Sequence, residues 1–213
     1  MNRRFESHLF WGPQSPLSAF AGMGLIVMAS TRFAYALICV GGLIWVYGFS
    51  ALVFSGARKI LPVRGRMVIL LFLSAFLCGI FMILMGLINP LLILGTAFFL
   101  LLIPPCCLGT GLFEASGSEY PVEVFSRALS EAIVLSCVIL ALALIREPLG
   151  MGTLSFPGGS QGLVELFNSG EEDAFILARF LSVSAGGLLL LGYVTALFRY
   201  FREQNGGIQE GDR

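Results

Sequence analysis

Long apolar runs, separated by short polar segments, make up most of this chain. An α-helix rises about 1.5 Å per residue, so roughly 20 apolar residues are needed to cross a hydrocarbon layer of about 30 Å. The first run is barely long enough and holds Gly22 and Gly24, whereas the second and third runs are uncharged and uninterrupted. The pattern predicts six membrane-spanning segments, at residues 15–30, 33–57, 67–88, 89–115, 128–145 and 174–200.

The fourth segment carries Pro104 and Pro105, followed directly by Cys106 and Cys107. Proline lacks a backbone N–H and clashes with the preceding turn, so we expect the helix to break here. A broken backbone within a bilayer is tolerated only where protein or a cavity satisfies its polar groups. The fourth segment is therefore expected to do more than anchor the chain.

The two halves of the chain correspond in pattern. A short or broken segment begins each half, and two ordinary spans follow it. Paired defective segments at matching positions point to a midplane site in proteins built from inverted repeats. We therefore predict a single all-α integral membrane domain over residues 1–213, with six transmembrane helices in two inverted three-helix repeats. The parts are repeat 1 at about 15–88, repeat 2 at about 89–200 and a tail at 201–213.

The composition agrees with this class of protein. The chain is 57% hydrophobic and 12% charged, and its mean hydropathy is +0.89; these values lie outside the range of soluble domains. The formal net charge is zero, so no basic field indicates nucleic acid. All five cysteines lie in apolar stretches, which argues against a disulfide framework. The single histidine, His8, excludes a haem held by two histidines of this chain.

Basic residues near the span ends predict the orientation, because they collect on the cytoplasmic side. The bias places both termini in the cytoplasm. The cytoplasmic side would hold Arg3, Arg4, Arg58, Lys59, Arg64, Arg66, Arg127, Arg199, Arg202 and Arg213. The outer side would hold Arg32, Arg146 and Arg179, with Arg146, Glu147 and Pro148 ending the fifth span before a loop.

Cys106 and Cys107 form the only adjacent pair of soft ligands in the chain. One reading is that both thiols are small apolar fillers beside the helix break. The other is ligation of iron, which takes four cysteines for each cluster. Because the other cysteines are scattered along other spans, a cluster would have to be shared with a second subunit. Glu114 follows within about two turns and is a candidate to line the same cavity.

Two stretches resemble a known family. Residues 145–154, IREPLGMGTL, look like the signature IREILGSGTL of RnfE/NqrD-type subunits from the Rnf/Nqr ion-translocating electron-transport complexes. Residues 103–115, IPPCCLGTGLFEA, are similar to the fourth-span segment of that family. In this alignment Cys107, Gly111 and Glu114 fall on the cysteine, glycine and glutamate of the family.

The resemblance implies a place within a complex. Two related six-span subunits of the family share one 2Fe-2S cluster, to which each contributes cysteines from its first and fourth spans. Electrons cross the membrane there, coupled to Na+ or H+ movement. The implied ligands of this chain are Cys107 and Cys106, and the implied cavity or half-helix positions are Gly22, Gly24, Pro104, Pro105, Gly111 and Glu114. The chain departs from the pattern at Gly24, which stands where the family has its first-span cysteine.

Three hypotheses follow for the function. The first is a membrane subunit of an Rnf/Nqr-like complex, with a divergent iron–sulfur site shared with a paralogous six-span subunit. The second is a cofactor-free scaffold subunit of such a complex, which the glycine at position 24 favours. The third is a small secondary transporter that uses the broken spans as a substrate site, although no midplane charge selects a substrate.

Overall fold

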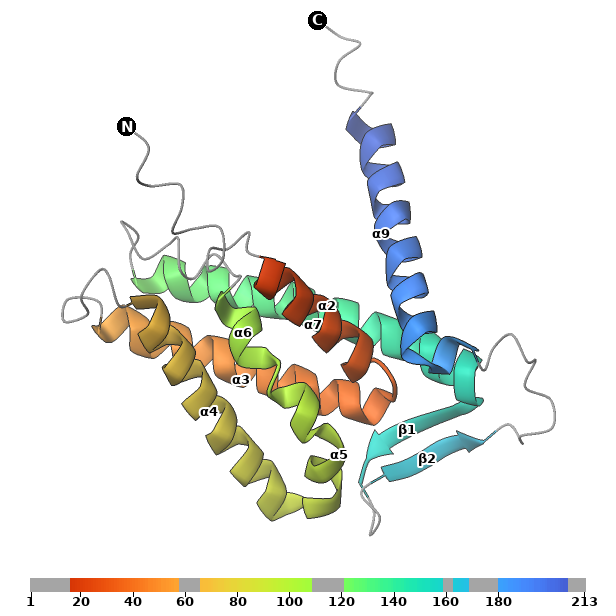
Figure 1. Cartoon of the computed structure of the whole chain (residues 1–213), viewed down its shortest axis with the longest axis horizontal. Coiled ribbons are helices and arrows are strands. Elements are labelled where there is room, and N and C mark those ends of the chain that lie inside the picture. The colour runs from red at the N-terminus through yellow and green to blue at the C-terminus, as the bar shows by residue number, and fades with distance from the viewer. Residues whose placement is uncertain (1–15, 58–65, 109–120, 159–162, 169–179, 207–213) are drawn as a thin grey trace, which may run out of the picture.

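The structure is a computed structural model, and it describes residues 16–57, 66–108, 121–158, 163–168 and 180–206. Helices dominate it, with one small hairpin of two strands at the edge (Figure 1). The two longest helices, α3 (Phe33–Ala57) and α7 (Pro121–Met151), pack along each other and form the centre of the bundle. The remaining helices pack around this pair, except that α9 extends away from the end of α7 (Figure 1).

Three helices of the described chain are long and apolar enough to cross a membrane: α3, α4 (Arg66–Ile88) and α7. The predicted second and third spans match α3 and α4 within a residue. Long uncharged runs form such helices because every backbone polar group must be bonded within the segment when no water is present. Large apolar side chains on the outside of the bundle, such as Phe72 and Leu94, are highly exposed and suit contact with lipid.

The first and fourth segments are short and broken, as predicted. Helix α2 (Pro16–Ala29) has 14 residues. The fourth segment is divided into α5 (Pro90–Leu100) and α6 (Ile103–Leu108). The break lies at residues 101–102, one turn earlier than the prolines suggested, because Pro104 and Pro105 fall in the first turn of α6. Proline is tolerated there, since N–H groups of a first turn have no partner within the helix.

The end of the fifth span differs from the prediction. Helix α7 continues through Arg146, Glu147 and Pro148 and ends at Met151. A proline in the last turn removes only one helical hydrogen bond, which packing can offset. The helix stops instead at Gly152, whose φ of 65° is in the left-handed region and whose N–H donates to the Pro148 carbonyl at 3.0 Å. Glycine adopts this conformation without the steric cost of a Cβ.

A hairpin follows where the sequence predicted an irregular loop. Strands β1 (Thr153–Pro157) and β2 (Leu163–Asn168) pair antiparallel, with a register shift between Leu154 and Ser155. Strand β1 packs against α3, and the Phe33 and Phe156 rings lie 5.2 Å apart. The all-α prediction therefore holds for the spans, whereas a two-stranded sheet stands at one end of the bundle.

The last span is also interrupted. A helical turn ends at Ser182, Val183 is a bend, and α9 begins after it (Ser184–Gly206). A Cβ at Gly186 would lie 2.2 Å from the Phe180 carbonyl oxygen, so this close approach of two backbones requires glycine. Six spans and two inverted repeats stay a prediction, because residues 109–115 of the fourth segment and 174–179 of the sixth lie outside the described residues.

Candidate functional site

Four of the five thiols gather in the interior. Cys39 of α3, Cys78 of α4, and Cys106 and Cys107 of α6 belong to one buried cluster. They are close enough to influence one another electrostatically. Cys39 and Cys78 therefore share the buried cluster of the pair on α6, although they come from other spans. Only Cys137, among the cysteines, is exposed.

A few polar groups lie next to this thiol cluster, which is otherwise packed among apolar side chains. The Tyr47 hydroxyl is hydrogen-bonded to the side chain of Cys107, and both residues are buried. Glu131 of α7 lies within electrostatic range of the two groups. The Cys78 thiol donates to the Leu100 carbonyl at 3.1 Å. This last bond satisfies an acceptor at the end of α5, where the helix break leaves carbonyl groups without helical partners.

The thiol cluster does not form a metal site as it stands. No three His, Cys, Asp or Glu side chains of the described residues are placed to hold a metal ion. Cys107 is fully buried and Cys106 is 5% exposed within this single chain. A cluster shared between subunits needs thiols at the surface that meets the partner. The two thiols do not fit such a cluster in this arrangement, and the iron–sulfur site stays a prediction.

The two defective segments lie against each other. Helix α2 packs on α6 and on the end of α5, and a Cβ at Gly24 would lie 3.8 Å from Leu102 Cδ1, at the break of the fourth segment. A Cβ at Gly22 would meet nothing within 4 Å. Pro104 is buried and Pro105 half-buried. Of the predicted positions, Gly24 thus meets the break directly, while Gly111 and Glu114 lie outside the described residues.

A second site was missed by the sequence analysis. Arg146 is 1% exposed, and its guanidinium donates five hydrogen bonds from its three nitrogens. Since a guanidinium has five N–H groups, every donor has an acceptor. The acceptors are the Val27 carbonyl at 2.5 Å, the Ser30 hydroxyl at 3.1 Å, and the carbonyls of Leu181, Ser182 and Val183 at 2.6, 3.0 and 2.9 Å.

Glu147 is the other half of this site and is fully buried. Its Oε2 accepts from the Phe33 N–H at 2.6 Å, and its Oε1 accepts from the Ser155 N–H at 2.9 Å. The carboxylate therefore caps the start of α3 and holds β1 against the bundle. A negative charge at a helix N-terminus is favoured by the helix dipole.

Together, Arg146 and Glu147 join four elements at one end of α7. Arg146 was predicted to end the fifth span on the outer side, whereas the structure has it inside α7, with its side chain bonded to the end of α2 and to the turn before α9. The signal in the sequence was an Arg-Glu pair directly continuous with an apolar run. Ionisable groups within spans are rare, and the first hypothesis for them is a function.

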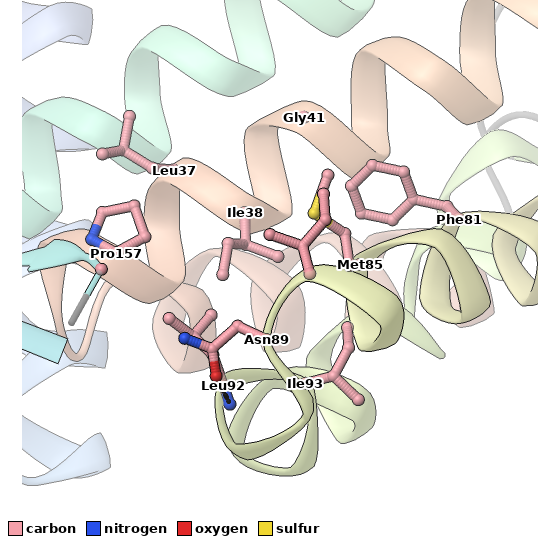
Figure 2. Close-up of a pocket in the computed structure, with 11 residues that line it drawn as sticks. Leu37, Ile38, Gly41, Phe81, Met85, Asn89, Leu92, Ile93 and Pro157 are labelled. Atoms are coloured by element: carbon pink, nitrogen blue, oxygen red, sulfur yellow. Dashed lines mark hydrogen bonds between the residues drawn. The ribbon is translucent and has the colours of Figure 1, made fainter. Parts of the chain in front are cut away.

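An apolar pocket of about 460 Å³ opens between α3, α4, α5 and the end of β1. Figure 2 shows Ile38, Phe81 and Met85 on its walls, with Asn89 at the turn between α4 and α5. The Asn89 Oδ1 accepts from the Leu92 N–H at 3.4 Å and so caps α5. Of the described residues that line the pocket, Asn89 is the one with a polar side chain, and the lining is otherwise apolar.

The three membrane-length helices, with short or interrupted segments packed around them, define a multi-pass integral membrane protein. A family model described as "Rnf-Nqr subunit, membrane protein" matches residues 8–195. The match covers most of the 213 residues, and the chain belongs to this family. This confirms the resemblance seen in residues 145–154 and 103–115. No curated protein matches the chain in sequence.

Proposed function

We propose that this chain is a membrane subunit of an electron-transport complex that couples electron transfer to Na+ or H+ translocation. The family match over residues 8–195 is the observation that carries the proposal. Two structural features support it: the defective segments face each other at Gly24 and Leu102, and the buried charges of the described residues are Arg146 and Glu147 alone. A chain with so few internal charges is suited to work with partner subunits rather than as a complete ion pathway.

The proposed setting is a bacterial inner membrane with both termini in the cytoplasm, in contact with a paralogous six-span subunit. The excess of basic residues on the predicted cytoplasmic side supports this orientation. The hairpin of β1 and β2 would then lie on the outer side. Exposed Glu165 offers a test: Glu165→Cys should react with a membrane-impermeant thiol reagent in intact cells. Reaction only after lysis would reverse the orientation.

The function is tested by removing the chain from its complex. Membrane vesicles from cells that lack it should lose electron transfer that responds to Na+ or to a proton gradient, and the wild-type chain should restore that activity. An affinity-tagged chain should also purify with flavin- or iron-containing subunits. Unchanged ion-coupled electron transfer, together with purification of the chain alone, would contradict the proposal.

A cofactor-free role within the same complex is the second candidate. Burial of Cys106 and Cys107 inside the chain favours it, as does Gly24 in place of a cysteine. Because a Cβ at Gly24 makes only an ordinary contact, Gly24→Cys should fold. Iron content and the EPR signal of the reduced complex should be the same for wild type, Gly24→Cys and Cys107→Ser. Loss of a 2Fe-2S signal in Cys107→Ser would instead assign that thiol to a shared cluster.

A further inference from the structure

The apolar pocket between α3, α4, α5 and the end of β1 is buried at its inner wall and exposed at its rim. The inner wall includes Ile38, Phe81 and Leu92, which are all buried (Figure 2). The rim includes Ile88, which is 76% exposed, and nearby Leu91 is exposed as well. Large exposed apolar surfaces mark contact with a membrane or a partner. In a chain with membrane-length helices, this pocket therefore opens toward the hydrocarbon layer.

Contacts outside the pocket hold it in shape. Helices α3, α4 and α5 pack on one another. Pro157 and Gly158 close one side of the pocket, and Glu147 holds their strand by accepting from the Ser155 N–H. A site that is formed before its ligand arrives loses less conformational entropy on binding. Binding of a ligand here therefore requires little rearrangement of the chain.

Water is a poor occupant of this pocket. A water molecule takes up about 30 Å³ and needs about two to four polar partners when it is buried. The pocket measures about 460 Å³, and among the described residues of its lining only Asn89 has a polar side chain. A group of waters would therefore lack partners. Acyl chains of the surrounding lipid need no polar partner and reach the pocket at its rim, so the lining favours an acyl chain.

Asn89 adds a hydrogen-bond donor at a defined depth. Helix α4 has 23 residues and spans about 34 Å, slightly more than a hydrocarbon layer of about 30 Å. Asn89 follows its last residue, so it lies at the edge of that layer, where the ester groups of phospholipids lie. Its Oδ1 accepts from the Leu92 N–H, whereas its Nδ2 donates to no other group of the described chain. An ester carbonyl is a suitable acceptor for this amide.

We propose that the pocket binds one acyl chain of a membrane phospholipid and that the Asn89 amide donates a hydrogen bond to the ester carbonyl of that chain. The bound chain contacts α3, α4, α5 and β1 together, so it joins the broken fourth segment to the centre of the bundle. Lipid tails elsewhere are as apolar as the lining, so the preference for this site comes from close packing and from the hydrogen bond. The inference does not depend on the proposed electron transfer.

The first test uses a phosphatidylcholine with a photoreactive diazirine at the middle of one acyl chain. The purified full chain is placed in vesicles of dioleoylphosphatidylcholine that contain this lipid, irradiated and digested, and the adducts are located by mass spectrometry. Phe81 precedes Asn89 by eight residues, about 12 Å along α4, and so lies at the depth of the middle of the chain. Wild type should carry adducts at Phe81 or Met85 in the pocket and at outward-facing Phe72.

A matched pair of substitutions on α5 separates the pocket from the outer surface. Ile93 lines the pocket, so Ile93→Trp should fill it and abolish the adducts at Phe81 and Met85 while those at Phe72 remain. Leu94 is the next residue and is 81% exposed, so Leu94→Trp should leave the pocket adducts unchanged.

The second test concerns the ester group. Unlabelled diacyl and dialkyl phosphatidylcholines compete with the photoreactive lipid, and the dialkyl lipid has ether oxygens but no carbonyl. For adducts at Phe81 of wild type, the diacyl lipid should compete about 2–10-fold better, the ratio that one hydrogen bond gives. Asn89→Asp keeps an oxygen to cap α5 but has no amide donor, so this preference should be lost. Adducts at Phe72 are the control and should show no preference.

Two results would overturn the proposal. One is labelling of Phe72 in wild type without adducts at Phe81 or Met85, which requires no substitution and so stands even if Ile93→Trp does not fold. The other is persistence of the pocket adducts in Ile93→Trp. Equal competition by the diacyl and dialkyl lipids in wild type would overturn the assigned hydrogen bond from Asn89.

Discussion

Two groups of side chains lie inside this bundle, and they satisfy their polar atoms in different ways. The thiol cluster is packed among apolar side chains and makes few hydrogen bonds. One joins Tyr47 to Cys107, and another joins Cys78 to the Leu100 carbonyl. Arg146 and Glu147 instead make seven hydrogen bonds, six of which join groups more than 30 residues apart in the sequence.

This difference shows which residues hold the fold together. Neutral thiols can be buried as small apolar groups, so their loss leaves little unsatisfied. A buried charge is costly unless it is fully paired, and the groups that pair with it lose their partners when it is removed. The charged pair, rather than the more conspicuous cysteines, is therefore expected to be the more sensitive site.

The strongest test of this contrast is Glu147→Ala. The substitution leaves the N–H groups of Phe33 and Ser155 without their acceptor, at a cost of about 1–3 kcal/mol for each. Glu147→Gln should be almost as harmful, because its amide group cannot accept the second bond. The free energy of unfolding in mixed micelles measures both variants. If Glu147→Ala lowers the free energy of unfolding by less than about 1 kcal/mol, the charged pair is not the more sensitive of the two groups.

Gly187→Ala should give the next largest effect. Its Cβ would lie 2.8 Å from Arg146 Nη1, so α9 or the guanidinium must move, and overpacking of this kind costs about 1–3 kcal/mol. Gly192→Ala is the matched control on the same helix, since nothing lies within 4 Å of its Cβ. That control should gain about 0.5–1 kcal/mol from helix propensity. Equal effects of the two substitutions would mean that the guanidinium does not fix the position of α9.

Tyr47→Phe probes the thiol cluster and should have a smaller effect. It removes one hydrogen bond, to Cys107, at a cost of about 0.5–1.5 kcal/mol. Tyr193→Phe, at a position that is 69% exposed, is the control and should change stability by less than about 0.5 kcal/mol. A loss in Tyr47→Phe as large as that in Glu147→Ala would break the contrast between the two groups.

Cys78→Ala should have the smallest measurable effect. The thiol donates to the Leu100 carbonyl at the break of the fourth segment, so the loss should be about 1 kcal/mol. Exposed Cys137→Ala should be neutral within about 0.5 kcal/mol. Stability of these two variants is measured in the same micelle titration, and a large loss in Cys137→Ala would indicate that this thiol faces a neighbour in the micelle.

Hydropathy alone was enough to locate the regular helices. The ends of α3 and α4 were predicted within a residue, because Arg32 and Arg58 flank the first run, and Arg66 and the Asn89-Pro90 turn flank the second. The break in the fourth segment was also predicted, although it lies one turn before Pro104. Helix ends and helix breaks depend on neighbouring residues in the sequence, so the hydropathy pattern can predict them.

The Arg146–Glu147 site could not be predicted in the same way. A charge at the end of an apolar run usually marks a membrane interface. Its burial here depends on the end of α2 and on the turn at Val183, which lie more than 30 residues away in the sequence. The hairpin was missed for a related reason, since its glycine- and serine-rich sequence becomes ordered partly through Glu147 and Phe33.

The bond from Arg146 to Val27 spans 119 residues, and this separation has a consequence for biosynthesis. Helix α2 is translated before the other described helices, yet the Val27 carbonyl in its last turn meets the Arg146 guanidinium only after α7 has been made. This contact of an early helix therefore forms late in synthesis. A nascent chain halted before residue 146 should keep α2 accessible to crosslinking at the translocon, and completion of the chain should end that exposure.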